Sequence, residues 1–342
     1  MDYGKILARS LTVTWKYRVL WLFGVLFAIF GGSRSGGNFN FPGGGSGSGM
    51  RDTGSLTPDF PPVNEQVILV IVAAAVVFVL IWILLSIIMR FISRGALIGL
   101  VHELETTETK PTVRRGFNLG FNHFKPLFGI GLIVNLPITL VMLGLIFVAA
   151  VPLLASLVPL AASGARRPAE LWSLAAVGIA SSIFLICCVA LFAWLVQLIV
   201  KPFYEFFVRA CVIGKRGAMD SLREGYRLVR ANLGSVAILY VLTIGIGIGY
   251  ALLMIPVFLI LIGIPAGAGF ATYLIAQSLT PALVVGGVIA IPMIALLLLI
   301  AGMYETFEST MWTEAYLAVT APPKIADAPA AVTPTPLEPA QT

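Results

Sequence analysis

KPFYEFFVRACVIGKRGAMDSLREGYRLVRANLG, residues 201–234, lies between two long uncharged stretches and decides how the rest of the chain is interpreted. It holds seven of the 22 Lys and Arg residues of the chain. Basic clusters beside apolar runs are typical of the cytoplasmic side of membrane spans. The segment therefore predicts cytoplasmic helices that lie under a membrane bundle.

The composition supports a membrane protein. The chain has 342 residues, of which 58% are hydrophobic and only 11% are charged, with a mean hydropathy of +0.97. A soluble domain has roughly 25% charged residues, so this chain has too few to cover a surface in water. The net charge of +6 is then explained by membrane topology, and no nucleic-acid partner is expected. The three cysteines, Cys187, Cys188 and Cys211, form no disulfide or metal-binding framework.

Apolar runs of the length needed to cross a bilayer, about 20 residues, occur along one membrane domain, residues 1–320. We expect six spans, at about 16–31, 67–89, 126–150, 171–200, 235–263 and 281–303. The first span is short, and snorkelling of Lys16 and Arg18 would lengthen it. A cleavable signal peptide is the competing interpretation of this N-terminal stretch.

The segments between the spans differ in composition. Residues 31–66 are rich in Gly, Ser and Pro and predict a flexible extracytoplasmic loop, and residues 321–342 predict a disordered cytoplasmic tail rich in Pro and Ala. A Gly/Pro-containing outer loop is expected at about 264–280, and Pro137 is expected to kink the third span. Amphipathic interfacial helices are expected at 1–18 and 112–125.

The distribution of basic residues predicts the orientation. Eighteen of the 22 Lys and Arg residues fall in the N-terminal segment, in 90–125, in 201–234 and in the C-terminal tail. By the positive-inside rule, both termini are expected in the cytoplasm of a prokaryotic cell, with the chain in its inner membrane.

A threefold pattern runs through the chain. GFNLGFNHFKPLFGIGL (116–132) and GYRLVRANLGSVAILYV (225–241) align without a gap, which places Gly116 on Gly225. Residues before the first span resemble them more weakly. The predicted fold class is thus an all-α integral membrane protein, with six transmembrane helices in three helix-pair repeats and cytoplasmic interfacial helices.

Two sets of side chains are candidates for binding. Basic residues near the membrane surface are expected to bind anionic head groups or a partner protein, with ordinary membrane anchoring as the alternative. They are Arg114, Arg115, Lys125, Arg223, Arg227 and Arg230. Spacing by four also predicts ion pairs of Glu205 with Lys201 and Arg209, and of Arg216 with Asp220.

The second set is polar and lies in or beside the spans. Apart from Lys16 and Arg18 at the start of the first span, no Asp, Glu, Lys, Arg or His falls within the predicted spans, which counts against ion-coupled transport and proton-transfer chemistry. The neutral polar residues Asn135, Gln197, Thr243 and Gln277 are candidates for lining an intramembrane cavity. Hydrogen bonding between helices is the alternative role.

The sequence predicts no metal site and no cofactor. The only cluster that resembles metal ligands is His102, Glu103 and Glu105 with His123. A zinc-protease helix needs two His four residues apart, whereas the second His here is 21 residues away. A solvated polar loop explains this cluster better.

Three stretches carry a resemblance to known families. They are WKYRVLWLFGVLFAIFGG (15–32), RRGFNLGFNHFKPLFG (114–129) and VRACVIGKRGAMDSLREGYRLVRANLG (208–234). The chain resembles uncharacterised bacterial and archaeal multi-pass membrane families, related to the membrane domain fused to some glycerophosphodiester phosphodiesterases. The resemblance implies a membrane domain and, by analogy, a role with lipids. It transfers no active-site residue to this chain.

The residues favour a membrane scaffold or accessory protein that binds lipid and has no catalytic site. Its expected partners are anionic membrane lipids, another membrane protein or further copies of the chain. The alternative is a transporter or permease for a lipid or a neutral small molecule. A central cavity containing Asn135, Gln197 or Gln277 would favour the transporter, and a solid core the scaffold. Ionisable groups clustered at the cytoplasmic rim would raise the case for an enzyme.

Overall fold

The computed structural model describes residues 2–31, 65–107, 110–162 and 168–320, which are all-helical. Of the predicted loop at 31–66, Gly31, Glu65 and Gln66 are helical, and residues 32–64 lie outside the described residues, as does the predicted tail at 321–342. The helices are α1 (Tyr3–Lys16), α2 (Val19–Gly31), α3 (Glu65–Thr107), α4 (Val113–Asn122), α5 (Phe124–Ala162), α6 (Pro168–Gly214), α7 (Ala218–Ala231), α8 (Leu233–Ala276) and α9 (Leu279–Thr320).

Among the described residues, five helices are long and apolar enough to cross a membrane: α3, α5, α6, α8 and α9. In the same residues a sixth span is present if α1 and α2 count as one, and they are bent by 98° at the break between them. At 1.5 Å per residue, the 13 residues of α2 extend about 20 Å, less than the hydrocarbon thickness of about 30 Å. The all-helical membrane class is confirmed, with five spans or six.

The long helices continue where the sequence predicted breaks. α8 runs through Pro256 and Pro265 and ends at Ala276, and the next residue, Gln277, has a φ of 44° in the turn into α9. The prediction of a loop at 264–280 is therefore wrong for most of these residues, which are helical. α6 likewise continues through Pro202 to Gly214, so the second half of that helix is not a separate interfacial element. Apolar surroundings favour unbroken helices because each backbone hydrogen bond is then made within the segment.

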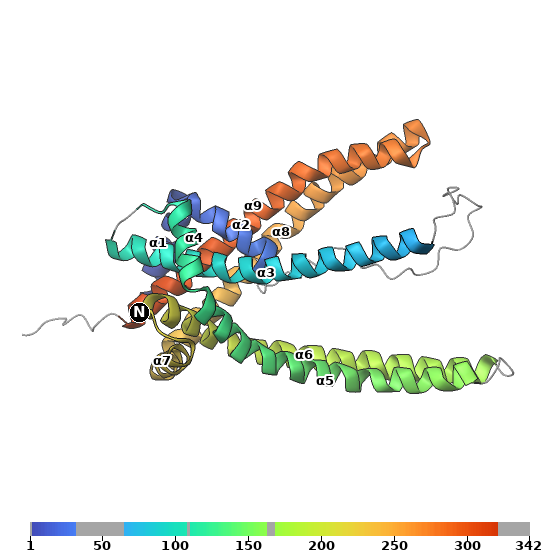
Figure 1. The fold of residues 1–342 in the computed structure, drawn as a ribbon, viewed down its shortest axis with the longest axis horizontal. Helices are drawn as coiled ribbons and strands as arrows, with labels where there is room; N and C mark the ends of the chain where they lie inside the picture. Colours follow the sequence, from blue (N-terminus) through green and yellow to red (C-terminus); the bar gives the residue numbers. More distant parts are fainter. Residues whose placement is uncertain (1, 32–64, 108–109, 163–167, 321–342) are drawn as a thin grey trace, which may run out of the picture.

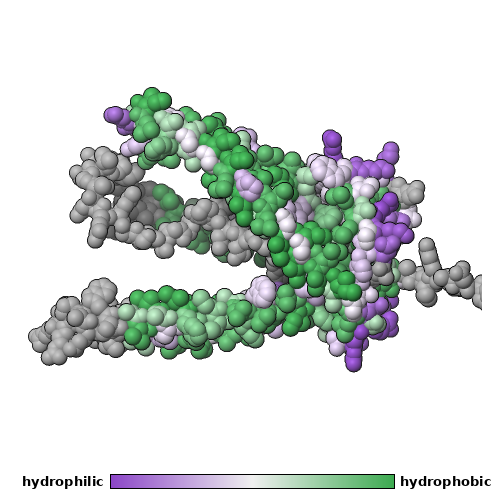
Figure 2. Space-filling model, turned by 180° about the vertical axis from the view of Figure 1, so that it is seen from behind, coloured by the Kyte–Doolittle hydropathy of each residue, from purple (hydrophilic) through white to green (hydrophobic). Residues whose placement is uncertain are grey.

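The molecule has a base from which three arms extend (Figure 1). The arms are the outer part of α3, the α5–α6 hairpin and the α8–α9 hairpin. The base consists of α1, α2, α4 and α7 with the inner ends of the long helices. Figure 2 shows apolar residues along the arms, and hydrophilic residues gathered at the end of the base away from them.

Burial follows the same division. The side chains that are largest and fully buried, among them Trp312, Phe206 and Phe23, all belong to the inner part of the molecule. Residues along the arms remain bare, with Leu259 72% exposed and Phe147 69% exposed. Exposed apolar surface on this scale needs an apolar solvent, so the arms are the part suited to the bilayer.

In the base, each short helix packs on the inner end of a long one. α4 contacts α3, α7 contacts α6, and α1 contacts α9, while α2 contacts both α3 and α9. Gly24 of α2 makes the closest approach. A Cβ there would lie 2.1 Å from the carbonyl oxygen of Gly302, so only glycine lets α2 and α9 meet at this distance.

Candidate functional site

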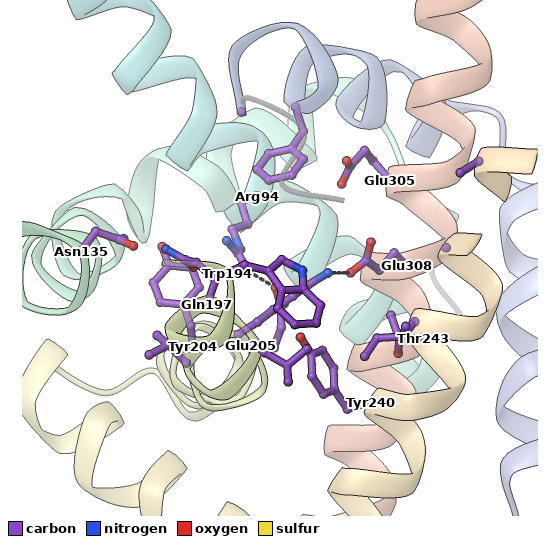
Figure 3. A pocket seen from close by; sticks show the side chains of 18 of the residues that line it. Arg94, Asn135, Trp194, Gln197, Tyr204, Glu205, Tyr240, Thr243, Glu305 and Glu308 are labelled. Carbon is purple, nitrogen blue, oxygen red and sulfur yellow. Dashed lines mark hydrogen bonds and ion pairs between the residues drawn. The ribbon is translucent and has the colours of Figure 1, made fainter. Parts of the chain in front are cut away.

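A cavity of about 550 Å³ lies between the inner parts of the long helices. Helices from all three arms line it, together with α2. Its apolar and aromatic walls include Phe27, Trp194, Leu198, Tyr204, Tyr240, Ile244, Ile248 and Ala251. Its charged floor, on the side of the base, consists of Arg94, Lys201, Glu205, Glu305 and Glu308 (Figure 3).

One ion-pair group joins three helices across the floor. Arg94 on α3 bonds one carboxylate oxygen of Glu205 on α6, and Arg209 bonds the other. Arg209 is 1% exposed and also donates to the carbonyl oxygen of Ser309 at 2.9 Å and to the hydroxyl of Thr313 at 3.3 Å. The Arg94 guanidinium lies 4.6 Å from the centroid of the Tyr204 ring. These contacts fix the inner ends of α3, α6 and α9 relative to one another.

A second ion pair stands beside the first. The ammonium of Lys201 on α6 lies 2.8 Å from the carboxylate of Glu308 on α9 (Figure 3). Glu305 precedes Glu308 by three residues on the same helix face, and it is 8% exposed. Among the residues that the structure describes, Glu305 has no hydrogen bond and no ion pair.

The predicted ion pairs are correct only in part. Glu205 and Arg209 form the i,i+4 pair expected from their spacing. Lys201 instead pairs with Glu308, and Arg216 pairs with Glu224 rather than with Asp220. Spacing along one helix predicts only neighbours on that helix, whereas these two basic side chains meet acids brought close by other helices or turns.

The fold places three of the four neutral polar residues in the cavity and the fourth elsewhere. Asn135, Gln197 and Thr243 line the cavity, from α5, α6 and α8. The Thr243 hydroxyl donates to the Leu239 carbonyl at 2.9 Å, so it is held by its own helix. Gln277 is placed differently: it is exposed at the outer turn between α8 and α9 and does not line this cavity. It was grouped with the others because the sequence predicted α8 to end earlier.

Sequence reasoning did not assign the charged floor to a cavity. All five of its residues were placed outside the spans, on separate cytoplasmic segments. One signal was present in the sequence: Glu305 and Glu308 share a helix face directly after an apolar run, as do Lys201 and Glu205. Only the packing of α3, α6 and α9 brings these two faces together.

The six predicted basic residues are all exposed on the base. Arg115 on α4 bonds Glu103 on α3, and this hydrogen bond raises the pKa of the Arg115 guanidinium. Arg227 pairs with Glu224 on α7 and lines a shallow polar groove with Arg223. The six residues are on three helices: Arg114 and Arg115 on α4, Lys125 on α5, and the other three on α7. α4 packs on α3, whereas α7 packs on α6 and α5.

The predicted polar loop around His102 is the helical end of α3. Glu105 accepts two hydrogen bonds from Arg9 of α1, at 3.0 and 3.2 Å. Glu103 binds Arg115 in the same way. These carboxylates hold α1 and α4 on α3, and the described residues contain no group of three side chains that could hold a metal ion.

Helix length and hydropathy define a multi-pass membrane protein, and a cavity with apolar walls and a charged floor lies between its long helices. The chain belongs to DUF7544, a family of unknown function, which matches residues 8–311. No curated protein and no solved structure matches the chain. The family assigns no activity, so the function must be inferred from the cavity itself.

Proposed function

We propose that this protein is a non-enzymatic membrane accessory protein that binds a membrane lipid. The lipid head group would occupy the charged floor, and its chains would lie along the apolar arms. The observation that carries this proposal is the cavity, which is ionic toward the base and apolar toward the arms.

The lining of the cavity matches the two parts of a lipid. Arg90 and Arg94 stand one turn apart on α3, and both line the cavity, as do the acids of α9. The guanidinium groups of α3 would bind the phosphate of a lipid head group. Toward the arms the lining includes Trp194 and Ile248, which are 59% and 57% exposed. A ligand that fits both regions has a charged head and an apolar body.

The surface and the topology complete the proposal. The six exposed basic residues Arg114, Arg115, Lys125, Arg223, Arg227 and Arg230 bind anionic head groups of the surrounding membrane or a partner membrane protein. The base faces the cytoplasm of a prokaryotic cell, and both termini are on that side. This orientation follows from the positive-inside rule, because 18 of the 22 Lys and Arg residues fall in the N-terminal segment, in 90–125, in 201–234 and in the C-terminal tail. Alternatively, the exposed apolar surface of the arms would be covered by further copies of the chain.

Three repeated units are also part of the proposal. Each unit would contain a short inner helix followed by two spans: α1–α2–α3, α4–α5–α6 and α7–α8–α9. The cyclic packing of α4 on α3, α7 on α6 and α1 on α9 supports this arrangement. The resemblance to membrane domains fused to glycerophosphodiester phosphodiesterases agrees with a lipid ligand.

A transporter or permease for a lipid or a neutral small molecule is the second candidate. The observation that favours it is the cavity containing Asn135 and Gln197, which is the arrangement expected of a transporter. Helices of all three arms line this cavity, so movement of one arm against another would change its access. Reconstituted liposomes test this candidate. Movement of labelled lipid between leaflets that depends on the protein would favour it, and equal rates with and without the protein would exclude this lipid activity.

Native mass spectrometry of the protein released from its own membranes tests lipid binding. We expect lipid retained at a fixed stoichiometry. Ala251→Phe should reduce retention because Ala251 lines the cavity, whereas Leu252→Phe should not, since Leu252 lies outside the lining and is 62% exposed. A bare protein, or equal retention by both variants, would contradict the proposal.

A further inference from the structure

One acid of the cavity, Glu305, forms no hydrogen bond or ion pair with another residue that the structure describes. Arg94 and Arg209 are used by Glu205, and Lys201 is used by Glu308. The carboxylate of Glu305 lies in the same lining, is 8% exposed, and has no hydrogen bond or ion pair within the described parts of the chain. A buried carboxylate costs considerable free energy unless a donor or a cation compensates it.

We infer that Glu305 binds a primary ammonium group, so that the ligand of this cavity is an amphiphile with an amine in its head group. This inference rests on the proposed lipid-binding function and names its ligand class. An ammonium group has three N–H donors and a positive charge. It would give the Glu305 carboxylate the hydrogen bond and the ion pair that no described side chain provides. A quaternary ammonium has the charge but no N–H donor.

The neighbouring charges favour a zwitterion over a simple cation. The groups around Glu305 have both signs: Lys201 and Arg94 raise the positive potential there, whereas their partners Glu308 and Glu205 lower it. In a head group with both a phosphate and an ammonium, the phosphate can bind the basic side chains and the ammonium can bind the acidic ones. Aminophospholipids have this chemistry, and so does a free phosphorylated amine.

The geometry separates the two ends of such a ligand. Glu305 projects from α9, and Arg94 projects from α3 toward the same space (Figure 3). The apolar lining of α6 and α8 leads from that space toward the arms. The ammonium is thus bound at α9, the phosphate is placed toward α3, and the acyl chains leave along the arms.

The test is lipid selectivity of the purified full chain, measured by native mass spectrometry in nanodiscs of mixed composition. The mixture contains phosphatidylethanolamine, phosphatidylcholine and phosphatidylglycerol with identical acyl chains. We expect the wild-type protein to retain phosphatidylethanolamine about tenfold over phosphatidylcholine, the factor typical of a hydrogen bond to a charged group. Equal retention of these two lipids would overturn the inference and leave lipid binding intact.

Two variants test whether Glu305 is the residue that selects phosphatidylethanolamine over phosphatidylcholine. Glu305→Gln keeps the shape of the side chain but loses its charge, and should bring the ratio of the two lipids close to one. Glu314→Gln changes an acid on the same helix that does not line the cavity, and should keep the wild-type ratio. Unchanged selectivity in Glu305→Gln would overturn the role of Glu305. If that variant does not fold, the wild-type comparison decides the inference.

Phosphoethanolamine, added to the protein in detergent, distinguishes a free ligand from a lipid. A rise in thermal stability that Glu305→Gln abolishes, without any retained lipid, would support the ammonium site and overturn the lipid function. No stabilisation together with no retained lipid would overturn both proposals. Lipid retained without selectivity would overturn only the ammonium site.

Discussion

The base and the arms of this molecule are built from the same helices but are stabilised by different surroundings. α9 shows both: Leu283 and Ile291 are 65% and 69% exposed along the arm, whereas Trp312 and Thr310 are fully buried in the base. In the base, helices hold one another by close packing and ion pairs. Along the arms, the apolar surface has to be covered by lipid or by other chains.

The difference shows where the protein itself determines structure. Ion pairs such as Arg94 with Glu205 and Lys201 with Glu308 lie at the inner ends of the helices, next to the cavity. Beyond the cavity, the hairpins α5–α6 and α8–α9 have mainly contacts within each pair. The cavity therefore marks the boundary between a rigid, self-supporting base and arms that depend on their solvent.

The largest effect is expected from Arg209→Met in the base. The substitution leaves the half-buried Glu205 with Arg94 alone, and loss of one partner from a buried ion pair costs about 3–5 kcal/mol. Thermal and denaturant unfolding in detergent would measure it. The control is Arg227→Met, whose pair with Glu224 is exposed and contributes about 0–1 kcal/mol. Equal losses in the two variants would contradict the distinction.

The second prediction compares two exposed positions in different solvents. Leu259 on the α8 arm is 72% exposed and Met219 on α7 of the base is 62% exposed. Leu259→Lys should cost about 2.5–3.5 kcal/mol because it places a charge in lipid, and Met219→Lys should cost almost nothing in water. The yield of folded, membrane-inserted protein measures both. Equal yields would show that the arm at Leu259 is not covered by lipid.

A third effect, of about 1–3 kcal/mol, is expected where α2 meets α9. Gly24→Ala would place a methyl group 2.1 Å from the Gly302 carbonyl oxygen, so the two helices must separate. Gly249→Ala on α8 is the matched control, since its added Cβ would meet nothing within 4 Å. The melting temperature should fall only for Gly24→Ala, and a fall of equal size at Gly249 would argue against this packing.

The smallest expected effect should be the same in both regions. Gln277 at the tip of an arm and Lys215 in the base have φ values of 44° and 48°, which L-residues adopt at a cost. Replacing either by glycine should stabilise the protein by about 1 kcal/mol or less, because backbone strain is local. Unfolding midpoints check this. A clear difference between the two would show that the surroundings contribute to the strain.

The all-helical membrane class was predictable from the sequence because uncharged runs of this length need the bilayer. The short helices α1, α4 and α7 were predictable as well, since they carry amphipathic patterns, although no start for α7 was predicted within 201–234. Helix ends were less predictable. Pro265 and the glycines around it indicate a loop in water, but in lipid the backbone gains more from remaining helical.

Three of the four predicted cavity residues line the same space, because polar side chains on apolar helices are placed where they avoid lipid. Gln277 was grouped with them because α8 extends further than its sequence suggests. The charged floor could not be predicted, since Glu305 and Arg94 are more than two hundred residues apart. No local pattern records a contact between helices so distant in the chain.

By itself, the sequence determined that the chain enters a membrane, which helices are amphipathic, and where positive charge gathers, because these properties depend on composition and period. The tertiary structure alone decided which charges pair between helices, and that Glu305 is the cavity acid that pairs with no other described residue. The physical reason is that an ion pair forms between side chains that are close in space. Their distance is set by the packing of α3, α6 and α9 rather than by their spacing along the chain.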